Sequence, residues 1–382
     1  MNKKFFVIAV FLLVVAGMVY FFRNEFAGKF YVPTETVLDQ GIVIENDSSD
    51  VVEDDQNIEV VADNLQIPWE IVFLPDGELL VSERTGTIKR IGKDKQTHVI
   101  NDVEHIGEGG LLGMTLHPKF AENNFIYIYL TVKTSNRLEN RVERYRLEGG
   151  RFLEKTVIID NIPAGANHNG GRIAFGPDGY LYITTGDAGQ SAASQNTNSL
   201  AGKILRVEDD GTVPSDNPFG NPVYSFGHRN SQGLAWDNDG LLWAVEHGRS
   251  GVLSGFDELN LISKGKNYGW PIIQGDEKRK GMESPVAQSG PDETWAPAGA
   301  AFLGNSIFFG GLRGKSLYEA RIANGKVSLK VHFRKEFGRI RAVVAGPDNY
   351  LYITTSNTDG RGVLYANDDK IIRINPRIFS LE

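Results

Sequence analysis

One histidine and one aspartate stand near the two ends of the segment NHNGGRIAFGPDGYLYITTGDAGQ (167–190). His168 comes just before an expected strand, and Asp187 follows the next expected strand in a Gly-Asp-Ala-Gly loop. Neighbouring strand ends can hold a carboxylate against an imidazole. Because the carboxylate then orients the ring, the pair could remove a proton from a substrate. A hairpin in which the two side chains only stabilise turns is the alternative.

Arginines recur where other strands are expected to begin. Guanidinium groups bind carboxylates and quinone-like oxygens through paired hydrogen bonds, so the set would suit a planar polyanion if the fold brings it together. Each arginine could instead tie neighbouring strands to a carboxylate. The set comprises Arg229, with Asn230 beside it, in GHRNSQG, Arg313 in GGLRGKSLY, and Arg339 and Arg341, which alternate on one side of a strand, in GRIRAV.

Two neighbouring segments offer oxygen ligands for a hard cation. EHGRSG (246–251) closes one expected hairpin, and DELNLISKGKNYGWP (257–271) combines the Glu258 carboxylate with a glycine-containing turn. Calcium prefers such oxygens, so a calcium site is one interpretation and a surface acid is the other. A zinc site is also conceivable, but the spacing of its ligands gives no compact pair. Those ligands would be His168, His228, Glu246 and His247.

A loosely repeated pattern runs along the chain from about residue 58. Each unit has a short apolar strand, a turn of the Pro-Asp-Gly or Asn-Asp-Gly type, and an alternating apolar strand. Six such units without a long helical period predict an all-β fold, a single six-bladed β-propeller over residues 58–382. Four clear units cover 71–83, 173–187, 234–248 and 343–357, and two degenerate ones cover 114–132 and 300–312.

The propeller architecture would bring residues from distant blades together. Loops at one end of a propeller converge on the central channel, so they can form one site. The loop GEGGLLGM (107–114), which carries Glu108, would join this set. The segment KIIRINP (370–376) is expected to be a strand that joins the first blade and closes the ring, because closure removes exposed sheet edges.

Charge is unevenly distributed, and cysteine is absent. The net charge is −8, yet nine acidic residues and no basic ones lie between residues 35 and 59, which leaves the rest of the chain nearly neutral. No run of Lys or Arg suggests a nucleic-acid partner. The lack of cysteine excludes disulfides, a thiolate nucleophile and a cysteine-linked lipid anchor.

The N-terminus has the features of a targeting segment. Lys3 and Lys4 precede the 18 uncharged residues 5–22, a length that just spans a bilayer. No convincing small-x-small cleavage motif follows, so residues 1–23 are predicted to form a transmembrane signal-anchor helix, with a cleaved signal peptide as the alternative. Residues 24–57 are predicted to be an acidic linker, or else a partner-binding tail. The bulk of the chain is therefore expected outside the cytoplasm.

The combination of these motifs resembles one known family. HNGGRIAFGPDGYLYITTGDAG, SFGHRNSQGLAWD, EHG, DELNLISKGKNYGWP and RIRAV together are similar to the soluble aldose (glucose) sugar dehydrogenases that use pyrroloquinoline quinone (PQQ). The resemblance covers roughly residues 60–376. It implies a six-bladed propeller that uses PQQ and Ca²⁺ to oxidise an aldose at C1 to the lactone.

The resemblance also implies roles for individual residues. His168 would take the proton from the C1 hydroxyl while hydride passes to the quinone, and Asp187 would hold the imidazole. Arg229 would contact the quinone oxygens and stabilise negative charge there. Further cofactor contacts would come from Glu108, Asn230, Arg313, Arg339 and Arg341. The carbonyls of Gly248 and Arg249 would reach the cofactor-bound calcium, and Glu258 with the Tyr268 carbonyl would bind a second, structural calcium.

Two residues depart from the family pattern. Glu108 stands where glutamine is expected, and a carboxylate there is expected to lower the affinity for an anionic cofactor. Arg249 replaces an expected proline, which matters little if only its carbonyl is used. The insertions are short, which resembles the compact, broad-specificity aldose branch of the family and predicts a monomer.

Two other functions stay open on the sequence. A calcium-dependent lactonase or esterase could use a similar propeller, histidine and metal, but the cluster of channel carboxylates expected for it is not found. A non-catalytic binding propeller is the second, and the presence of both His168 and Asp187 argues against it. Fold alone does not decide, because propellers host many functions. The sequence indicates neither the preferred sugar nor the electron acceptor.

Overall fold

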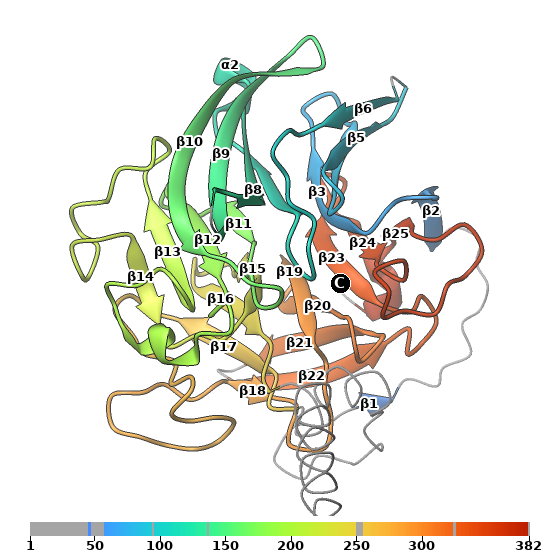
Figure 1. Cartoon of the computed structure of the whole chain (residues 1–382). Coiled ribbons are helices and arrows are strands. Elements are labelled where there is room, and N and C mark those ends of the chain that lie inside the picture. The colour runs from blue at the N-terminus through green and yellow to red at the C-terminus, as the bar shows by residue number, and fades with distance from the viewer. Residues whose placement is uncertain are drawn as a thin grey trace, which may run out of the picture.

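The structure is a computed structural model that describes residues 45–46, 57–93, 95–135, 137–249, 255–323 and 326–380. These residues form six sheets arranged as blades around a central channel, which confirms the predicted all-β six-bladed propeller (Figure 1). The predicted signal anchor (1–23) and nearly all of the acidic linker (24–57) lie outside the described residues. No helix in the described ranges is long and apolar enough to cross a membrane.

The strands follow one another from blade to blade in chain order. The first sheet contains β3 (Pro68–Phe73), β4 (Leu79–Glu83), β5 (Thr87–Ile91) and β6 (Gln96–Val99). The second contains β7 (Leu111–Leu116), β8 (Phe125–Lys133), β9 (Leu138–Glu148) and β10 (Arg151–Pro163), with the short helix α2 (Phe120–Asn123) between its first two strands. The third contains β11 (Ile173–Phe175), β12 (Leu181–Thr185), β13 (Lys203–Val207) and β14 (Val223–Phe226).

The remaining three sheets complete the ring. The fourth contains β15 (Ser231–Trp236), β16 (Leu242–Glu246), β17 (Glu258–Ile262) and β18 (Ala287–Gln288). The fifth contains β19 (Pro297–Leu303), β20 (Ser306–Gly311), β21 (Leu317–Ala323) and β22 (Lys326–His332), which β1 (Glu45–Asn46) joins in parallel. The sixth contains β23 (Ile340–Ala345), β24 (Leu351–Thr355), β25 (Ile371–Ile374) and β2 (Ile58–Ala62).

The six repeats seen in the sequence fall on the first two strands of the six sheets. In the third sheet, for example, β11 pairs with β12 from Ile173↔Ile183 to Phe175↔Leu181. The intervening turn closes through a hydrogen bond from Gly179 N to Gly176 O, and Gly179 has φ +82°. A positive φ is costly for most residues, which explains the recurring glycine or asparagine at this turn position.

The ring closes within the sixth sheet. β25 pairs with β24 on one side and with β2 on the other, in the register Ile58↔Ile374 (Figure 1). The expectation that residues 370–376 join the first blade was therefore wrong in detail. The strand that pairs with β25 is β2. It comes from the start of the propeller, but it forms the outer strand of the sixth sheet. Closure still covers both ends of the domain with strand pairing.

Six apolar clusters of described residues fill the spaces between neighbouring sheets. Close approach of the sheets near the channel depends on glycine. A Cβ added to Gly113 in β7 would lie 2.2 Å from the carbonyl oxygen of Gly171, and one added to Gly233 in β15 would lie 2.5 Å from that of Ala298. Glycine at these positions lets one backbone pack directly on the next, which brings the strand starts of different blades together.

Candidate active site

The structure brings His168 and Asp187 together. Nδ1 of His168 lies 2.7 Å from Oδ1 of Asp187. The aspartate side chain is buried, whereas 17% of the histidine side chain stays exposed. Because an ionised carboxylate only accepts hydrogen bonds, Nδ1 carries the hydrogen and Nε2 keeps its lone pair. The pair is therefore an oriented imidazole on a side chain that stays partly exposed.

The backbone around His168 fixes the direction of its side chain. The residue has φ +59°, in the left-handed region, and its carbonyl accepts a hydrogen bond from Ala188 N at 3.1 Å. Gly186 lies directly against it, since a Cβ on Gly186 would come 1.8 Å from the His168 oxygen. The loop that carries His168 therefore packs directly against the loop that carries Asp187. A positive φ at a histidine costs free energy, and the surrounding contacts hold it there.

The second carboxylate oxygen of Asp187 is held from the fourth blade. The indole N–H of Trp270 donates to Oδ2 at 2.9 Å, and the backbone N–H of Gly189 donates to Oδ1 at 2.8 Å. Burial by itself raises the pKa of Asp187, but the hydrogen bond and charge of His168 and these two donors lower it below its ordinary value. Asp187 is therefore ionised at neutral pH. Trp270 stands in KNYGWP, where the sequence analysis assigned it no role.

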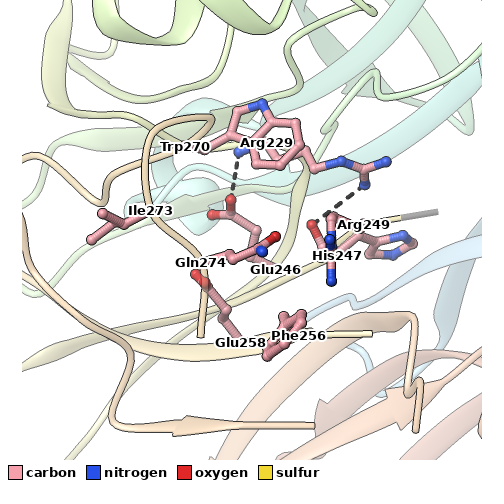
Figure 2. Close-up of a pocket in the computed structure, with 10 residues that line it drawn as sticks. Arg229, Glu246, His247, Arg249, Phe256, Glu258, Trp270, Ile273 and Gln274 are labelled. Carbon is pink, nitrogen blue, oxygen red and sulfur yellow. Dashed lines mark hydrogen bonds between the residues drawn. The ribbon is translucent and has the colours of Figure 1, made fainter. Parts of the chain in front are cut away.

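Arg229 and Asn230 lie beside this pair. The Arg229 guanidinium sits 5.3 Å from the centre of the Trp270 ring, and its Nη1 donates to the carbonyl of His247 at 3.4 Å (Figure 2). Asn230 accepts a hydrogen bond from Gly170 N at 2.9 Å. Among the described residues, Nδ2 of Asn230 and Nε2 of His247 are buried without a hydrogen-bond partner. The site thus holds polar groups that the protein itself does not satisfy.

Glu246 forms a buried network behind Arg229. Its Oε2 accepts hydrogen bonds from His228 Nδ1 at 2.8 Å and from Ser231 Oγ at 2.7 Å, and its Oε1 accepts one from the backbone of Arg229. His228 also stacks on Tyr268, with ring centres 4.8 Å apart. Within the residues described, no three His, Cys, Asp or Glu side chains are grouped to hold a metal, so the zinc arrangement receives no support.

Arg339 and Arg341 converge on a buried aspartate that the sequence analysis missed. Oδ2 of Asp359 accepts hydrogen bonds from Arg339 Nη2 at 2.7 Å and Nε at 3.1 Å, and Nη2 of Arg341 lies 3.7 Å away. Burial, and then nearby arginine charge, lower the pKa of Arg341 to about 9. Nη1 of Arg339 donates to the carbonyl of Leu312, the residue before Arg313, at 2.9 Å. The Arg339 side chain of the sixth blade therefore contacts the loop of the fifth blade that carries Arg313.

Glu108 joins the histidine loop to the sixth blade. Its Oε2 accepts a hydrogen bond from the backbone N–H of His168 at 2.9 Å, and its Oε1 pairs with Nη1 of Arg361 at 2.8 Å. Burial raises the pKa of Glu108, but Arg361 and His168 outweigh it, so the pKa lies well below its ordinary value. Arg361, which the sequence analysis did not single out, places a cation beside the carboxylate expected to weaken binding of an anionic cofactor.

Gly248 and Arg249 follow β16 and line a pocket together with Arg229, Glu246 and Trp270 (Figure 2). Gly248 N donates to Oδ1 of Asp257 at 2.8 Å, and the Arg249 carbonyl accepts from Gly255 N at 3.3 Å. The Arg249 guanidinium lies 5.0 Å from the ring centre of Phe256 (Figure 2). Only the backbone of this segment carries the predicted metal ligands, and the Arg249 side chain packs against Phe256, which lines the pocket with it.

Glu258 lines the pocket with Glu246, and its environment is strongly acidic. Burial, and then the charges of Glu246 and Asp257, raise the pKa of Glu258 to about 8. The side chain of Tyr268 is buried, and its hydroxyl donates to the carbonyl of Leu261 at 2.7 Å. Tyr268 could therefore reach a metal only through its backbone, as the sequence analysis assumed. A bound cation would stabilise the ionised form of Glu258 in this environment.

Comparisons with known proteins agree with this architecture. The family description Glucose / Sorbosone dehydrogenase matches residues 65–366. The aldose sugar dehydrogenase YliI of Escherichia coli is 32% identical over 360 residues, covering 84% of this chain and 93% of the relative. Quinoprotein glucose dehydrogenase B of Acinetobacter calcoaceticus is 34% identical over 256 residues, covering 56% of this chain and 52% of the relative. The PQQ-bound aldose sugar dehydrogenase of Streptomyces coelicolor has a TM-score of 0.77 and 40% identity, covering 83% of this chain and 97% of that one.

The propeller, with a histidine–aspartate pair beside converging arginines, thus falls in a class of sugar-oxidising enzymes. The chain belongs to the Glucose / Sorbosone dehydrogenase family and is an oxidoreductase. The family resemblance inferred from the motifs is confirmed by these matches.

Proposed function

We propose that this protein oxidises aldose sugars at C1 to the corresponding lactones, with PQQ as cofactor and with bound Ca²⁺. The observation that carries the proposal is the 2.7 Å contact between His168 and Asp187, which would leave Nε2 to act as the base on a partly exposed side chain. The PQQ-bound state of a structural relative that is 40% identical supports the choice of cofactor.

The residues present fit a planar anionic cofactor. PQQ carries three carboxylates and two quinone oxygens, all of them hydrogen-bond acceptors. Arg229, Arg339 and Arg341 supply buried positive charge, and Nδ2 of Asn230 is a buried donor without a partner among the described residues. Arg313 and the Glu108–Arg361 pair would complete the set of contacts. When bound, PQQ supplies the two-electron acceptor for the hydride that leaves C1 of the sugar.

The protein side chains would manage the proton and the developing charge. Nε2 of His168 takes the proton of the C1 hydroxyl, and Asp187 stabilises the imidazolium that forms because Oδ1 holds the Nδ1 hydrogen. Arg229 places a fixed positive charge next to the base, where it stabilises negative charge that develops on oxygen. Trp270 keeps the aspartate oriented throughout.

Calcium would bind at two places in this proposal. The carbonyls of Gly248 and Arg249 would hold the ion that also contacts the cofactor. Glu258 and the Tyr268 carbonyl would hold a second, structural ion. Support comes from the raised pKa of Glu258, about 8, which reflects burial and then the charges of Glu246 and Asp257. A divalent cation would favour the ionised form of this group.

Reconstitution tests the proposed function. The purified propeller is mixed with PQQ, with Ca²⁺, or with both, and reduction of an artificial electron-accepting dye by glucose is followed. Dye reduction that requires both additions is expected. Hydrolysis of a lactone without PQQ would instead identify a lactonase. Saturable PQQ binding without oxidation of any aldose in a panel would point to a non-catalytic binding propeller.

The N-terminal assignments are also proposals. Residues 1–23 would anchor the enzyme to the membrane with the propeller outside the cytoplasm, and 24–57 would be a spacer. Support comes from Lys3, Lys4 and the 18 uncharged residues that follow. The enzyme would act as a monomer and pass electrons to an acceptor not yet known. Fractionation of cells that express the full chain, compared with a chain lacking residues 2–23, tests the anchor. Equal recovery of both in the soluble extract would contradict it.

A further inference from the structure

We propose that the Glu108–Arg361 ion pair is a strap that holds the His168 loop against the sixth blade, so that both side chains are positioning residues for the base. The pair joins residues 253 positions apart in the chain, with Oε1 and Nη1 2.8 Å apart. This inference rests on the proposed role of His168 as the base. It adds a device that sets where that base stands.

The first half of the strap is the contact between the Glu108 loop and the histidine loop. The backbone N–H of Glu108 donates to the carbonyl of Ala166 at 2.8 Å, and a Cβ on Gly107 would lie 2.1 Å from the same oxygen. The carboxylate then receives the N–H of His168 at 2.9 Å. Because His168 has φ +59°, its backbone benefits from an acceptor that holds it in this conformation.

The second half of the strap is the contact between Arg361 and Asp359, the aspartate that also binds Arg339. Arg361 lies in the connection between β24 and β25, and its backbone N–H donates to Oδ1 of Asp359 at 2.9 Å. The other oxygen of Asp359 receives Arg339 at 2.7 Å. Hydrogen bonds therefore connect Glu108, through the side chain and backbone of Arg361, to Asp359 and on to Arg339, which is a proposed cofactor contact.

The apolar side chains at the tip of this connection are exposed. Val363 and Leu364, just after Arg361, are 61% and 68% exposed, so apolar packing contributes little there. The Arg361 side chain itself is 51% exposed, and an ordinary ion pair of that exposure adds little to global stability. The expected effect is therefore local. It concerns the order of two loops and the placement of His168 rather than the stability of the propeller.

Four variants separate the two contacts of Glu108. Glu108→Gln keeps an oxygen acceptor for His168 N–H but loses the charge, and Glu108→Ala loses both contacts. Arg361→Gln loses the ion pair and leaves the Glu108 carboxylate in place to accept the His168 N–H. The exchange Glu108→Arg with Arg361→Glu restores an ion pair, but an arginine cannot accept the His168 N–H. Arg146→Gln removes the 2.9 Å pair with Glu154 on β9 and β10 and serves as the control for loss of a surface ion pair.

Hydrogen exchange in the cofactor-free protein gives a readout that needs no activity. In Arg361→Gln and Glu108→Gln, amides in segments 101–110 and 356–369 should exchange about threefold faster or more, as expected for loss of a partly exposed pair. The double exchange variant should return these rates to within about twofold of the wild type. Unchanged exchange in both single variants would overturn the strap, whether or not the double variant folds.

Turnover with PQQ and Ca²⁺ tests the effect on the base. Glu108→Ala and the double exchange variant should lower kcat about tenfold or more, with KM changed much less, because the histidine backbone has lost its acceptor. The control variant Arg146→Gln should retain kcat within about threefold. Equal kcat in Glu108→Ala and the wild type would refute a positioning role. Absence of any dehydrogenase activity in the wild type would reject the proposed function instead, while the exchange rates would still decide whether the strap exists.

Discussion

The indole N–H of Trp270 and the carboxylate of Asp187 form a 2.9 Å hydrogen bond that joins the fourth blade to the third. It uses Oδ2, while Oδ1 receives His168 at 2.7 Å. The carboxylate is thus held by donors on both oxygens, since Oδ1 also accepts the N–H of Gly189. This relationship restricts the rotation of Asp187 and, through it, the direction of the imidazole.

Replacing Trp270 with phenylalanine should loosen this arrangement without emptying the space that the ring fills. Trp270→Phe loses one buried hydrogen bond to a charged group, so kcat should fall by about 3- to 30-fold. Steady-state dye reduction with saturating PQQ, Ca²⁺ and glucose measures the effect. Trp236→Phe, at the outer end of β15, is the matched control and should leave kcat unchanged. Wild-type kcat in Trp270→Phe would show that the bond does not orient the pair.

Loss of the imidazole should remove the base while leaving the cofactor contacts in place. His168→Ala is expected to reduce kcat by about 10²- to 10⁴-fold, the usual contribution of a general base. PQQ binding, measured by its absorbance change on titration, should stay within a few-fold of the wild type. Near-normal dye reduction by His168→Ala would refute the assigned role, and loss of PQQ binding would show that the histidine is chiefly a cofactor contact.

The lowered pKa of Asp187 predicts how stability depends on pH. A carboxyl group whose pKa is lower in the folded protein stabilises the fold above its unfolded pKa of about 3.9. That contribution is lost as the pH falls through the folded pKa. Asp187→Asn lacks it, so the wild type should be the more stable protein at pH 6, and the difference should shrink below about pH 4. Urea unfolding between pH 3 and 7 measures this difference. A constant difference across the range would contradict the lowered pKa.

Calcium removal should destabilise the protein through the acidic pocket. With Ca²⁺ at about 100 times its Kd, the proposed site would contribute about 2.7 kcal/mol, so a chelator should lower the Tm of the wild type by several degrees. In Glu258→Gln the chelator should have little effect. At pH 8 without Ca²⁺ this variant should be at least as stable as the wild type, because the amide removes repulsion with Glu246 and Asp257. An equal loss of Tm in both proteins would exclude Glu258 as a ligand.

Close approach of neighbouring blades predicts the cost of one added methyl group. In Gly113→Ala the new Cβ would meet the Gly171 oxygen at 2.2 Å, so the strands must move apart. The free energy of unfolding should fall by about 1–3 kcal/mol. Thr115→Ala on the same strand, where the side chain is only partly buried, should cost less and serves as the control. Equal stability of Gly113→Ala and the wild type would mean that the inner strands have room to adjust.

The sequence was sufficient to predict the blades because residues close together in the chain determine each turn and each strand. A turn such as the one closed by Gly179 depends on neighbouring positions, and its strands alternate with a period of two. The pairing of β25 with β2 was harder to predict in detail, since nothing local in residues 370–376 tells which sheet receives the N-terminal strand.

The candidate site was only partly predictable for a similar reason. His168 and Asp187 lie on one hairpin, so their meeting could be inferred from the segment itself. Trp270, Asp359 and Arg361 act on the site from other blades, and each has a sequence context that suits an ordinary loop residue. A signal did exist for Arg361, because the unusual Glu108 called for a compensating cation, but only the folded chain identifies which arginine supplies it.

The pairing of the first and last propeller strands links the two ends of the domain mechanically. Ile58 of β2 pairs with Ile374 of β25, so force that pulls the two ends of the domain apart would load this one sheet and unzip β2 from β25. A protease cut between β2 and β3 would likewise allow β2 to dissociate from the sixth blade, and this blade carries Arg339 and Arg341. The β2–β25 pairing that closes the ring therefore also protects the proposed cofactor contacts from local unfolding that begins at the ends of the domain.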